Sequence, residues 1–307
     1  MPDKPTLVSN LVACFRRQRP LRGGSLIVTM FGDSILPRGG AIALGSLIEL
    51  AAPFGLNERL VRTASVRLAK EGWLEARRCG NRSEYRLSSD GRERFADATK
   101  RIYNGPETTW SGRWTLIVLP PMRAMERQEL RKELVWRGFG ELSNGVFAHP
   151  EVDPHALRLQ LRPAELLAKL LIFDANLAAD DAPQRLVALG WNLDELSVRY
   201  QRFVKRFERV RSALRSEHRV QDQQCFVVRT LLIHEYRRLH LRDPLLPPRL
   251  LRANWPGTHA EQLCRDIYSR VFAPSEAYLS KVAVHLDGPL PSPDQSVMQR
   301  FGGLAPV

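Results

Sequence analysis

Hydrophobic positions recur with a helical period in several stretches of the chain, most regularly between residues 57 and 71. On a helix that turns about 100° per residue, one side of this stretch is apolar. That side carries Leu60, Val61, Ala64 and Leu68. Asn57 is a favourable N-cap residue, and Gly72 stands where many helices end. The pattern predicts an amphipathic helix over Asn57–Glu71.

Shorter patterns surround this helix. We predict helices over residues 25–31 and 45–52, a strand over 41–44, strands over 74–78 and 84–87 joined by turn residues 79–83, and a helix from Ser88 and Ser89 to about Tyr103. This order, in which a basic hairpin follows a helix-turn-helix, predicts a winged helix-turn-helix domain over residues 22–104. Residues 1–21 are polar, basic and interrupted by Pro5 and Pro20, which predicts a flexible tail.

A different order of elements follows over residues 108–178. We predict a strand, a helix, a hairpin, a helix and a strand over residues 114–119, 125–136, 138–148, 154–161 and 170–174. This β-α-β-β-α-β order is that of a ferredoxin-like domain. Residues 104–111 and 178–183 have the composition of linkers on its two sides.

The last third of the chain has mainly helical patterns. They cover residues 193–212, 226–241, 260–271 and 275–284 and predict a helical domain over residues 184–287. Residues 288–307 are rich in proline and glycine, which predicts a second flexible tail. Together the patterns predict an α+β, multidomain fold with an N-terminal winged helix-turn-helix, a central ferredoxin-like domain and a helical C-terminal domain.

The composition is that of an ordinary globular protein with an excess of positive charge. The 307 residues include 46 Lys and Arg against 33 Asp and Glu, a net charge of +13, and hydrophobic residues make up 44%. No apolar run approaches the roughly 20 residues of a membrane span, and no secretory signal is recognisable. The four cysteines are far apart, as expected of reduced thiols in a cytoplasmic protein.

Most of the basic residues are arginines, whose guanidinium groups bind phosphates and guanine bases through paired hydrogen bonds. The polar side of the 57–71 helix suits the major groove, where arginine reads guanine and Val66 would meet a thymine methyl group. By itself such a face is also typical of a solvent-exposed helix, but the preceding helices and the following hairpin favour DNA. The candidate DNA-binding residues are Asn57, Arg59, Arg62, Thr63, Val66, Arg67, Lys70, Arg78 and Arg82.

Several separated motifs resemble those of the PaaX family. They are SLIVTMFGD at residues 25–33, LGSLI at 44–48, NERLVRT at 57–63, KEGWL at 70–74, LIHEYR at 232–237, RDP at 242–244 and WPG at 255–257. The resemblance spans about residues 22–287 in one order. It implies an N-terminal winged helix, a central domain similar to that of small CRISPR-adaptation nucleases, and a helical C-terminal domain.

PaaX proteins are bacterial transcriptional repressors of phenylacetate-degradation operons. The resemblance therefore implies a homodimer that binds double-stranded operator DNA and is released from it when phenylacetyl-CoA binds. It also implies a cytoplasmic protein that lies at the nucleoid when bound to DNA. Such a protein is not an enzyme and carries no cofactor, since phenylacetyl-CoA acts only as its effector ligand.

An acyl-CoA effector requires cations for its phosphates and an apolar slot for its aryl group. Arginine, histidine and aromatic residues gather on two predicted C-terminal helices and just beyond them. The candidate effector-binding residues are Arg199, Tyr200, Arg229, His234, Tyr236, Arg237 and Trp255. The alternative is that these arginines are surface charges or pair with Glu235 and Asp243.

Other functions compete with this interpretation. A metal-dependent nuclease acting through the central domain would need an acidic residue near the end of the first strand, and residues 114–121 contain none. His234 and Glu235 are not followed by a second histidine at zinc-site spacing, so we expect no metal-binding residues. An acyl-CoA enzyme is a further alternative, although no catalytic motif is present. A repressor that responds to a different aryl-CoA is the last.

Overall fold

The computed structural model describes residues 7–17, 23–104, 109–150, 152, 157, 170–178, 182–216 and 220–304. It is a mixed helix and sheet structure with two compact units. The first unit comprises residues 1–104, 203–237 and 260–307, and the second unit comprises residues 105–202 and 238–259. The predicted division into three consecutive domains stays a prediction.

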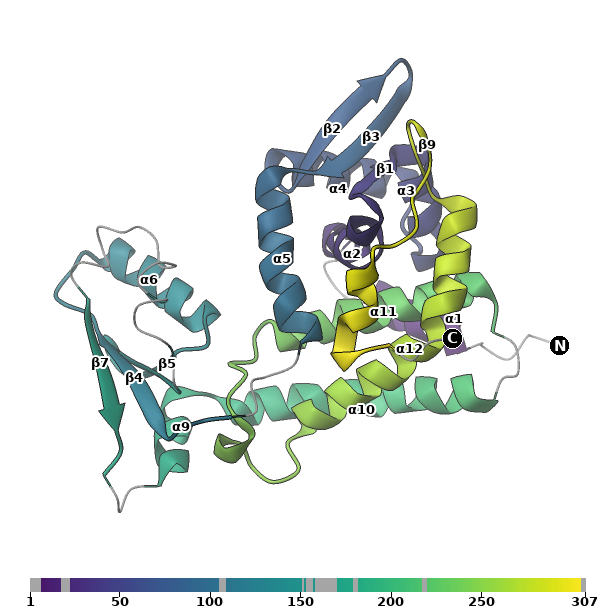
Figure 1. The fold of residues 1–307 in the computed structure, drawn as a ribbon. Helices are drawn as coiled ribbons and strands as arrows, with labels where there is room; N and C mark the ends of the chain where they lie inside the picture. The colour runs from purple at the N-terminus through teal and green to yellow at the C-terminus, as the bar shows by residue number, and fades with distance from the viewer. Residues whose placement is uncertain are drawn as a thin grey trace. The chain divides into compact units, whose positions relative to one another are not determined.

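The N-terminal part of the first unit combines helices with a small sheet (Figure 1). Its elements are α2 (Gly23–Met30), η1 (Phe31–Ile35), η2 (Leu36–Arg38), β1 (Ala41–Ala43), α3 (Leu44–Ala51), η3 (Ala52–Phe54), α4 (Glu58–Lys70), β2 (Leu74–Cys79), β3 (Arg82–Leu87) and α5 (Ser89–Tyr103). The strands are antiparallel in the order β1-β3-β2, and Figure 1 shows the β2–β3 hairpin extending outward beyond α4. The predicted succession of helices and strands is confirmed in this segment.

A serine cap connects the hairpin to α5. The Ser88 hydroxyl accepts a hydrogen bond from the Gly91 N–H at 2.9 Å and donates one to the Gly72 carbonyl at 2.6 Å. A Cβ atom on Gly91 would lie 2.3 Å from the carbonyl oxygen of Trp73, so only glycine fits. The predicted cap therefore holds the start of α5 beside the end of α4.

The expected N-terminal tail contains a helix, α1 (Leu7–Arg16). Leu11 and Phe15 lie four positions apart, on one face of this helix, and both are buried. The Phe15 ring packs edge-on against His234, with 5.5 Å between the ring centres. The prediction of a loose segment was wrong for residues 7–16, because this short apolar stripe is enough to anchor a helix.

The expected C-terminal tail also has regular structure. It contributes β9 (Gly288–Pro289), which pairs with β8 (Val284–His285), and the 3₁₀ helix η5 (Gln295–Gly302). Val297 and Phe301 are buried in the first unit. The prolines and glycines interrupt regular helix but leave these apolar side chains free to pack, so the prediction of a flexible tail was wrong for residues 288–304.

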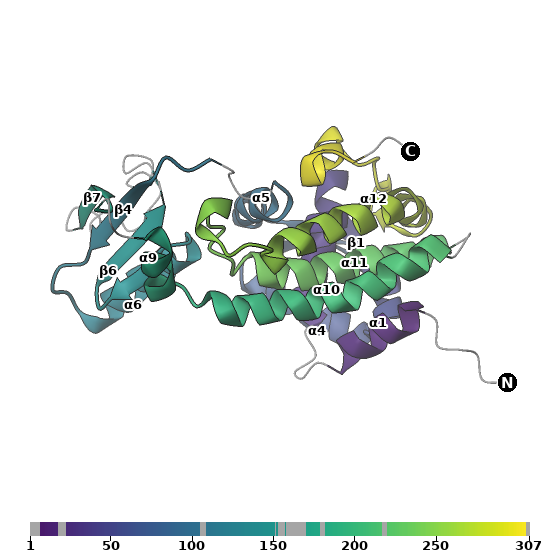
Figure 2. The same ribbon diagram turned by 90° about the horizontal axis from the view of Figure 1, so that it is seen from below.

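Three long helices form the C-terminal region and run side by side (Figures 1 and 2). They are α10 (Leu193–Ser216), α11 (Asp222–His240) and α12 (Pro256–Val282). Within the first unit, Phe203 packs against Tyr236 with 5.8 Å between ring centres, and Arg211 donates to Asp266 at 3.0 Å. The prediction of a helical C-terminal region is confirmed.

One helix of this region differs from the prediction. We expected two helices over residues 260–284, but α12 is continuous and contains Pro274. A proline inside a helix removes one backbone hydrogen bond and usually bends or ends it. Val271 and Ser275 on either side are fully buried, so packing holds the helix together through the proline.

The second unit contains a four-stranded antiparallel sheet in the order β5-β6-β4-β7. Its elements are β4 (Arg113–Val118), α6 (Ala124–Trp136), β5 (Gly140–Ser143), β6 (Val146–Pro150), β7 (Leu171–Asn176), α9 (Pro183–Gly190) and η4 (Pro248–Leu250). Strands and the first helix agree with the prediction. The predicted helix over residues 154–161 lies outside the described residues except for Leu157.

Apolar side chains cover this sheet on both faces. Ile117 and Phe147 pack with Leu134 of α6 in one cluster. Trp114 packs with Val187 of α9 in another. Successive strand residues point to opposite faces, so this double coverage explains why β4 is apolar along almost its whole length.

In the part of the chain that the structure describes, no helix has both the length and the apolar character needed to cross a membrane. The same residues contain no cluster of three or more histidine, cysteine, aspartate or glutamate side chains arranged to hold a metal ion.

Candidate nucleic-acid interface

Helix α4 is the centre of the candidate interface. Asn57 caps it, and its side-chain oxygen accepts a hydrogen bond from the Leu60 N–H at 2.9 Å. The residues that face the core of the first unit are Val61, Ala64, Ser65 and Leu68. Their spacing of three and four positions gives one narrow buried stripe, so every other side of α4 is available to solvent or a partner.

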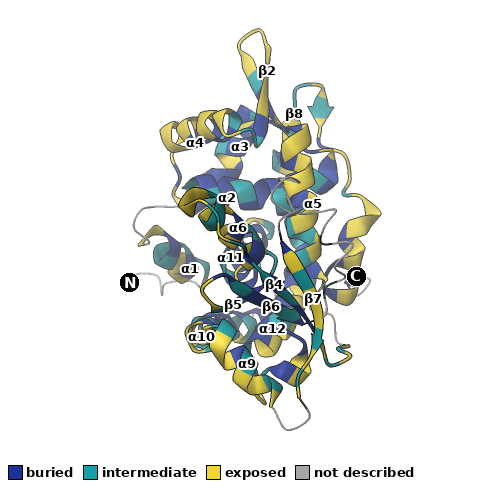
Figure 3. Cartoon of the chain, turned by 90° about the vertical axis from the view of Figure 1, so that its left-hand side faces the viewer, coloured by how far each residue is buried: buried dark blue, intermediate teal, exposed yellow. Residues whose placement is uncertain are grey.

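All the predicted DNA-binding residues of α4 and its cap are exposed. They are Asn57, Arg59, Arg62, Thr63, Val66, Arg67 and Lys70. Leu60 was predicted to lie on the buried side of the helix, but its side chain is 43% exposed. Ser65 is buried in the stripe instead. Leu60 lies at the edge of the first turn, just outside that stripe. Figure 3 shows the outer side of α4 and much of the β2–β3 hairpin as exposed surface.

Two arginines of this face have partners on α4 itself. Arg62 lies 2.6 Å from Glu58, and Arg67 lies 3.6 Å from Glu71. All four side chains are more than half exposed, and ion pairs of this kind contribute about 0–1 kcal/mol. A phosphate or a guanine base can therefore replace the glutamate at little cost.

The β2–β3 hairpin supplies the second part of the interface. Its strands pair from Leu74–Leu87 to Cys79–Arg82 and are joined by a two-residue turn, Gly80 and Asn81. Gly80 has φ +56°, a conformation that glycine adopts without strain. The strands are thus longer than predicted, and the turn that joins them has two residues instead of the predicted five.

Arg78 and Arg82, the predicted basic residues of this hairpin, are exposed. They lie near the turn, at the outer end of the strands. Together with the polar face of α4 they form two neighbouring basic surfaces of the first unit.

A buried ion cluster holds the N-terminal elements to the C-terminal helices. The Asp33 carboxylate accepts hydrogen bonds from Arg229 at 2.7 Å, from Arg300 at 2.9 Å, and from the hydroxyls of Tyr103 at 2.6 Å and Tyr268 at 2.9 Å. Burial alone would raise the pKa of Asp33, but the two guanidinium groups and the two hydroxyls lower it below its ordinary value. Asp33 is therefore a buried carboxylate that stays charged.

The cluster continues through Glu276 of α12. This carboxylate pairs with Arg229 and with Arg38, whose Nε lies 2.9 Å from it. Arg38 also donates to the carbonyl of Pro291 at 2.9 Å. The segment from α2 to η2, against which α4 packs, is therefore tied to both α12 and the C-terminal segment.

Four of the predicted effector-binding residues lie in the first unit, three of them buried and Arg237 half-buried. Arg229 is fully buried and bonded to Asp33 and Glu276, and Tyr236 is also fully buried. His234 shares a hydrogen bond of 3.0 Å with Thr29, and Arg237 donates to the Ser25 carbonyl at 2.8 Å. These contacts give the residues a structural role in the first unit. Arg229 pairs with Asp33 and Glu276 rather than with Glu235 or Asp243.

The other three effector candidates lie in the second unit. The Tyr200 hydroxyl donates to Asp243 at 2.8 Å, and its ring packs against Trp255 with 6.1 Å between centres. Arg199 pairs with Glu195 one helical turn earlier. The structure therefore divides the seven candidates between two separate environments.

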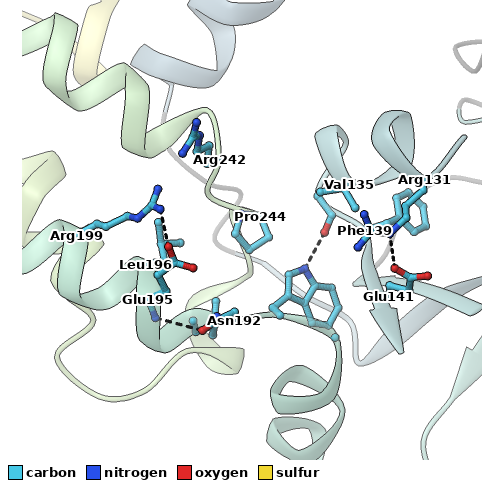
Figure 4. A pocket seen from close by; sticks show the side chains of 14 residues that line it. Arg131, Val135, Phe139, Glu141, Asn192, Glu195, Leu196, Arg199, Arg242 and Pro244 are labelled. Atoms are coloured by element: carbon cyan, nitrogen blue, oxygen red, sulfur yellow. Dashed lines mark hydrogen bonds and ion pairs between the residues drawn. The ribbon is translucent and has the colours of Figure 1, made fainter. Parts of the chain in front are cut away.

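A cavity of about 440 Å³ in the second unit lies beside Arg199 (Figure 4). Three arginines border it, and Figure 4 shows Arg199 and Arg242 on one side and Arg131 on the other. Its apolar lining includes Phe139 and Leu196. Glu141 and Glu195 also line it and pair with Arg131 and Arg199, so Arg242 is the arginine of the lining for which no acidic partner is described. Arginines beside an apolar surface are features that an anionic aryl ligand requires.

Sequence reasoning missed the residues that organise the first unit. Asp33 lies within one of the quoted motifs, yet its partners Tyr103, Tyr268 and Arg300 are 70 or more positions away. Arg131 at the cavity was missed for the same reason. Only a contact map would have brought these residues together.

Family models match most of the chain. A model described as PaaX-like protein matches residues 22–91, one described as PaaX protein central Cas2-like domain matches residues 107–187, and one described as PaaX-like protein C-terminal domain matches residues 191–281.

Individual proteins match over a similar extent. The chain is 38% identical over 289 residues to the transcriptional repressor PaaX of Escherichia coli (strain K12), covering 93% of this chain and 92% of that protein. It is also similar to the solved structure of the uncharacterized protein Rv0674 from Mycobacterium tuberculosis, with 25% identity and a TM-score of 0.50. That match covers 75% of this chain and 89% of the other. The three matched segments and the extent of these similarities show that the chain belongs to the PaaX family.

Proposed function

We propose that this chain is a transcriptional repressor of phenylacetate catabolic genes that binds double-stranded operator DNA. The observation that carries the proposal is the wholly exposed basic face of α4 beside the basic end of the β2–β3 hairpin. The similarity to a transcriptional repressor over nearly the whole chain supports it.

The order α3, α4 and β2–β3 supports a winged helix-turn-helix arrangement. In that arrangement α4 enters the major groove, where Arg59 or Arg62 reads a guanine and Val66 meets a thymine methyl group. Arg78 and Arg82 of the hairpin reach phosphates or the adjacent minor groove and set the register of the protein on DNA.

The sheet order of the second unit supports a ferredoxin-like central domain, because α6 follows β4 and the hairpin β5–β6 comes next. We assign this domain a spacer or dimerisation role rather than catalysis. The repressor acts as a homodimer in which each protomer contacts one operator half-site, and the dimer sets the spacing between half-sites.

Phenylacetyl-CoA is the proposed effector. The cavity beside Arg199 offers Arg131, Arg199 and Arg242 to its phosphates and Phe139 and Leu196 to its apolar parts. Binding there would disfavour the DNA-bound arrangement, and linkage then requires that DNA weaken effector binding by the same factor.

A gel shift with the DNA upstream of the chain's own operon tests this function, at one fixed salt concentration because phosphate contacts make affinity salt-dependent. We expect specific binding that phenylacetyl-CoA abolishes and that free phenylacetate or free CoA does not. If binding is specific but phenylacetyl-CoA leaves it unchanged, the DNA-binding part of the proposal stands and phenylacetyl-CoA is not the effector. The absence of specific binding would contradict the proposal as a whole.

A further inference from the structure

A second cavity, of about 410 Å³, lies in the first unit between the two basic surfaces. Helix α4 borders it with Arg62, and the hairpin turn borders it with Asn81 and Arg82. The start of α3 contributes Gly45, and strand β8 near the end of the chain contributes His285. We call this the α3–α4–hairpin cavity.

The lining of this cavity suits an anion. Two arginines border it, from different elements, and none of the described residues that line it is acidic. Asn81 and Ser83 add short polar side chains. Glu58, the partner of Arg62, belongs to the same helix but is not among the lining residues.

The position of the cavity identifies the anion. When a helix occupies the major groove and a hairpin turn occupies the neighbouring minor groove, one sugar–phosphate strand passes between them. The lining of the cavity includes both α4 and the turn of the β2–β3 hairpin, so in the proposed docking that strand passes over it. We propose that this cavity holds a backbone phosphate of the bound DNA and that β8, from the C-terminal segment, takes part in holding it through His285.

Strand β8 is firmly attached at this place. The Ser46 hydroxyl of α3 donates to the carbonyl of Val282 at 3.2 Å and accepts from the Val284 N–H at 3.1 Å. The Leu286 N–H donates to the buried carboxylate of Glu84 in β3 at 2.8 Å. The C-terminal segment is therefore joined to both α3 and the hairpin beside the cavity.

His285 has a defined hydrogen-bonding role. Its Nδ1 accepts a hydrogen bond from the Asp287 N–H at 3.1 Å, so Nε2 carries the proton when the ring is neutral. The side chain is 27% exposed. Nε2 is thus a hydrogen-bond donor in this tautomer, on a residue that lines the cavity.

Gly45 makes the assignment testable without disturbing the fold. It lies in the first turn of α3, it is exposed, and a Cβ atom added to it would meet nothing within 4 Å. Gly45→Glu places a negative charge at the cavity, in a helical turn where acidic residues are stabilising. Gly45→Gln has nearly the same size and no charge, and serves as the matched control.

The experiment measures the affinity of the full-length variants for a duplex from upstream of the chain's own operon and for an unrelated duplex of equal length. We expect Gly45→Glu to bind both duplexes at least about tenfold more weakly than Gly45→Gln, with unchanged or higher melting temperature. We expect Arg82→Gln to reduce the slope of log affinity against log salt by about 1.

His285→Ala tests the contribution of β8, with the exposed His259 on α12 as its control. We expect His285→Ala to weaken binding to both duplexes by about tenfold. His259→Ala should change the affinity for neither duplex. The inference rests on the proposed function, and the outcomes of this experiment distinguish the failure of one from the failure of both. Equal binding by both Gly45 variants and by both histidine variants, with strong wild-type binding, overturns the cavity assignment alone. A wild-type chain that binds neither duplex overturns both.

Discussion

Arg229 donates to Asp33 across 2.7 Å although the two residues are 196 positions apart in the sequence. Both side chains are 1% exposed. The contact joins helix α11 to the segment that follows α2, and Arg300 joins η5 to the same carboxylate. The surface that supports α4 is therefore fixed by residues from the far end of the chain.

Replacing one member of this pair is expected to destabilise the protein strongly. Arg229→Met leaves the Asp33 carboxylate buried with one cation fewer, and breaking a buried pair in this way costs about 3–5 kcal/mol. Urea unfolding at pH 7 measures the loss. The exposed pair of Lys281 and Asp222 is the control, since Lys281→Ala should cost less than about 1 kcal/mol. Equal losses in the two variants would contradict the central role of the cluster.

The cluster also predicts a specific dependence of stability on pH. The pKa of Asp33 is below its ordinary value of 3.8 in the folded chain, so the unfolded chain binds a proton there first as pH falls. The stabilisation is complete above that ordinary value and is lost as pH falls through the lower pKa of the folded state. Urea unfolding midpoints measured from pH 7 down to pH 2 should therefore decline as pH falls below the ordinary pKa of aspartate.

Arg229→Met provides the comparison for this pH profile. Removing a guanidinium raises the pKa of Asp33 toward its ordinary value, so the decline should be smaller over the same range. Identical profiles in the wild-type and variant proteins would show that another group is responsible.

The cysteines are expected to react at very different rates. Burial raises the pKa of the Cys225 thiol to about 11 and also raises that of Cys264, so few thiolates form there near neutral pH. Cys79 is exposed at the end of β2. A maleimide should label Cys79 well before Cys225, and bound DNA should slow the labelling of Cys79. Equal labelling rates with and without DNA would argue against contact by the hairpin.

The cavity of the second unit predicts a variant that binds DNA but responds poorly to the effector. Arg242 is exposed beside this cavity, and Arg242→Gln removes one of its three cations. We expect the phenylacetyl-CoA concentration for half-release to rise about tenfold, which corresponds to roughly 1.4 kcal/mol, with unchanged affinity for DNA. Arg209→Gln, an exposed arginine on α10, is the control. An unchanged response would place the effector elsewhere.

Local signals explain what the sequence predicted well. The cap at Asn57, the apolar spacing of α4 and the turn residues between β2 and β3 lie within a few positions of each other, and the structure contains all three elements. Leu60 was assigned to the wrong side because the buried stripe is narrower than the apolar pattern and includes a serine.

Contacts between distant residues explain what the sequence did not predict. Arg229 was proposed to bind an effector because it lies on a helix with other arginines, and this assignment stays a prediction. Its ion-pair partners Asp33 and Glu276 could not be foreseen, since they lie 196 and 47 positions away. The C-terminal segment was assigned to a flexible tail because of its composition, yet Phe301 packs against Tyr103 with 5.2 Å between ring centres. No local pattern encodes either pairing.

The recognition face of α4 is the central claim, and equilibrium binding to the upstream DNA tests it most directly. Arg59→Ala and Arg62→Ala should each weaken binding to this DNA by about 1–3 kcal/mol if the residue contacts a base, and should weaken binding to unrelated DNA less. Arg209→Ala removes the same charge from an exposed site on α10 and should change both affinities little. If Arg59→Ala and Arg62→Ala bind the upstream DNA as tightly as Arg209→Ala does, α4 is not the recognition helix.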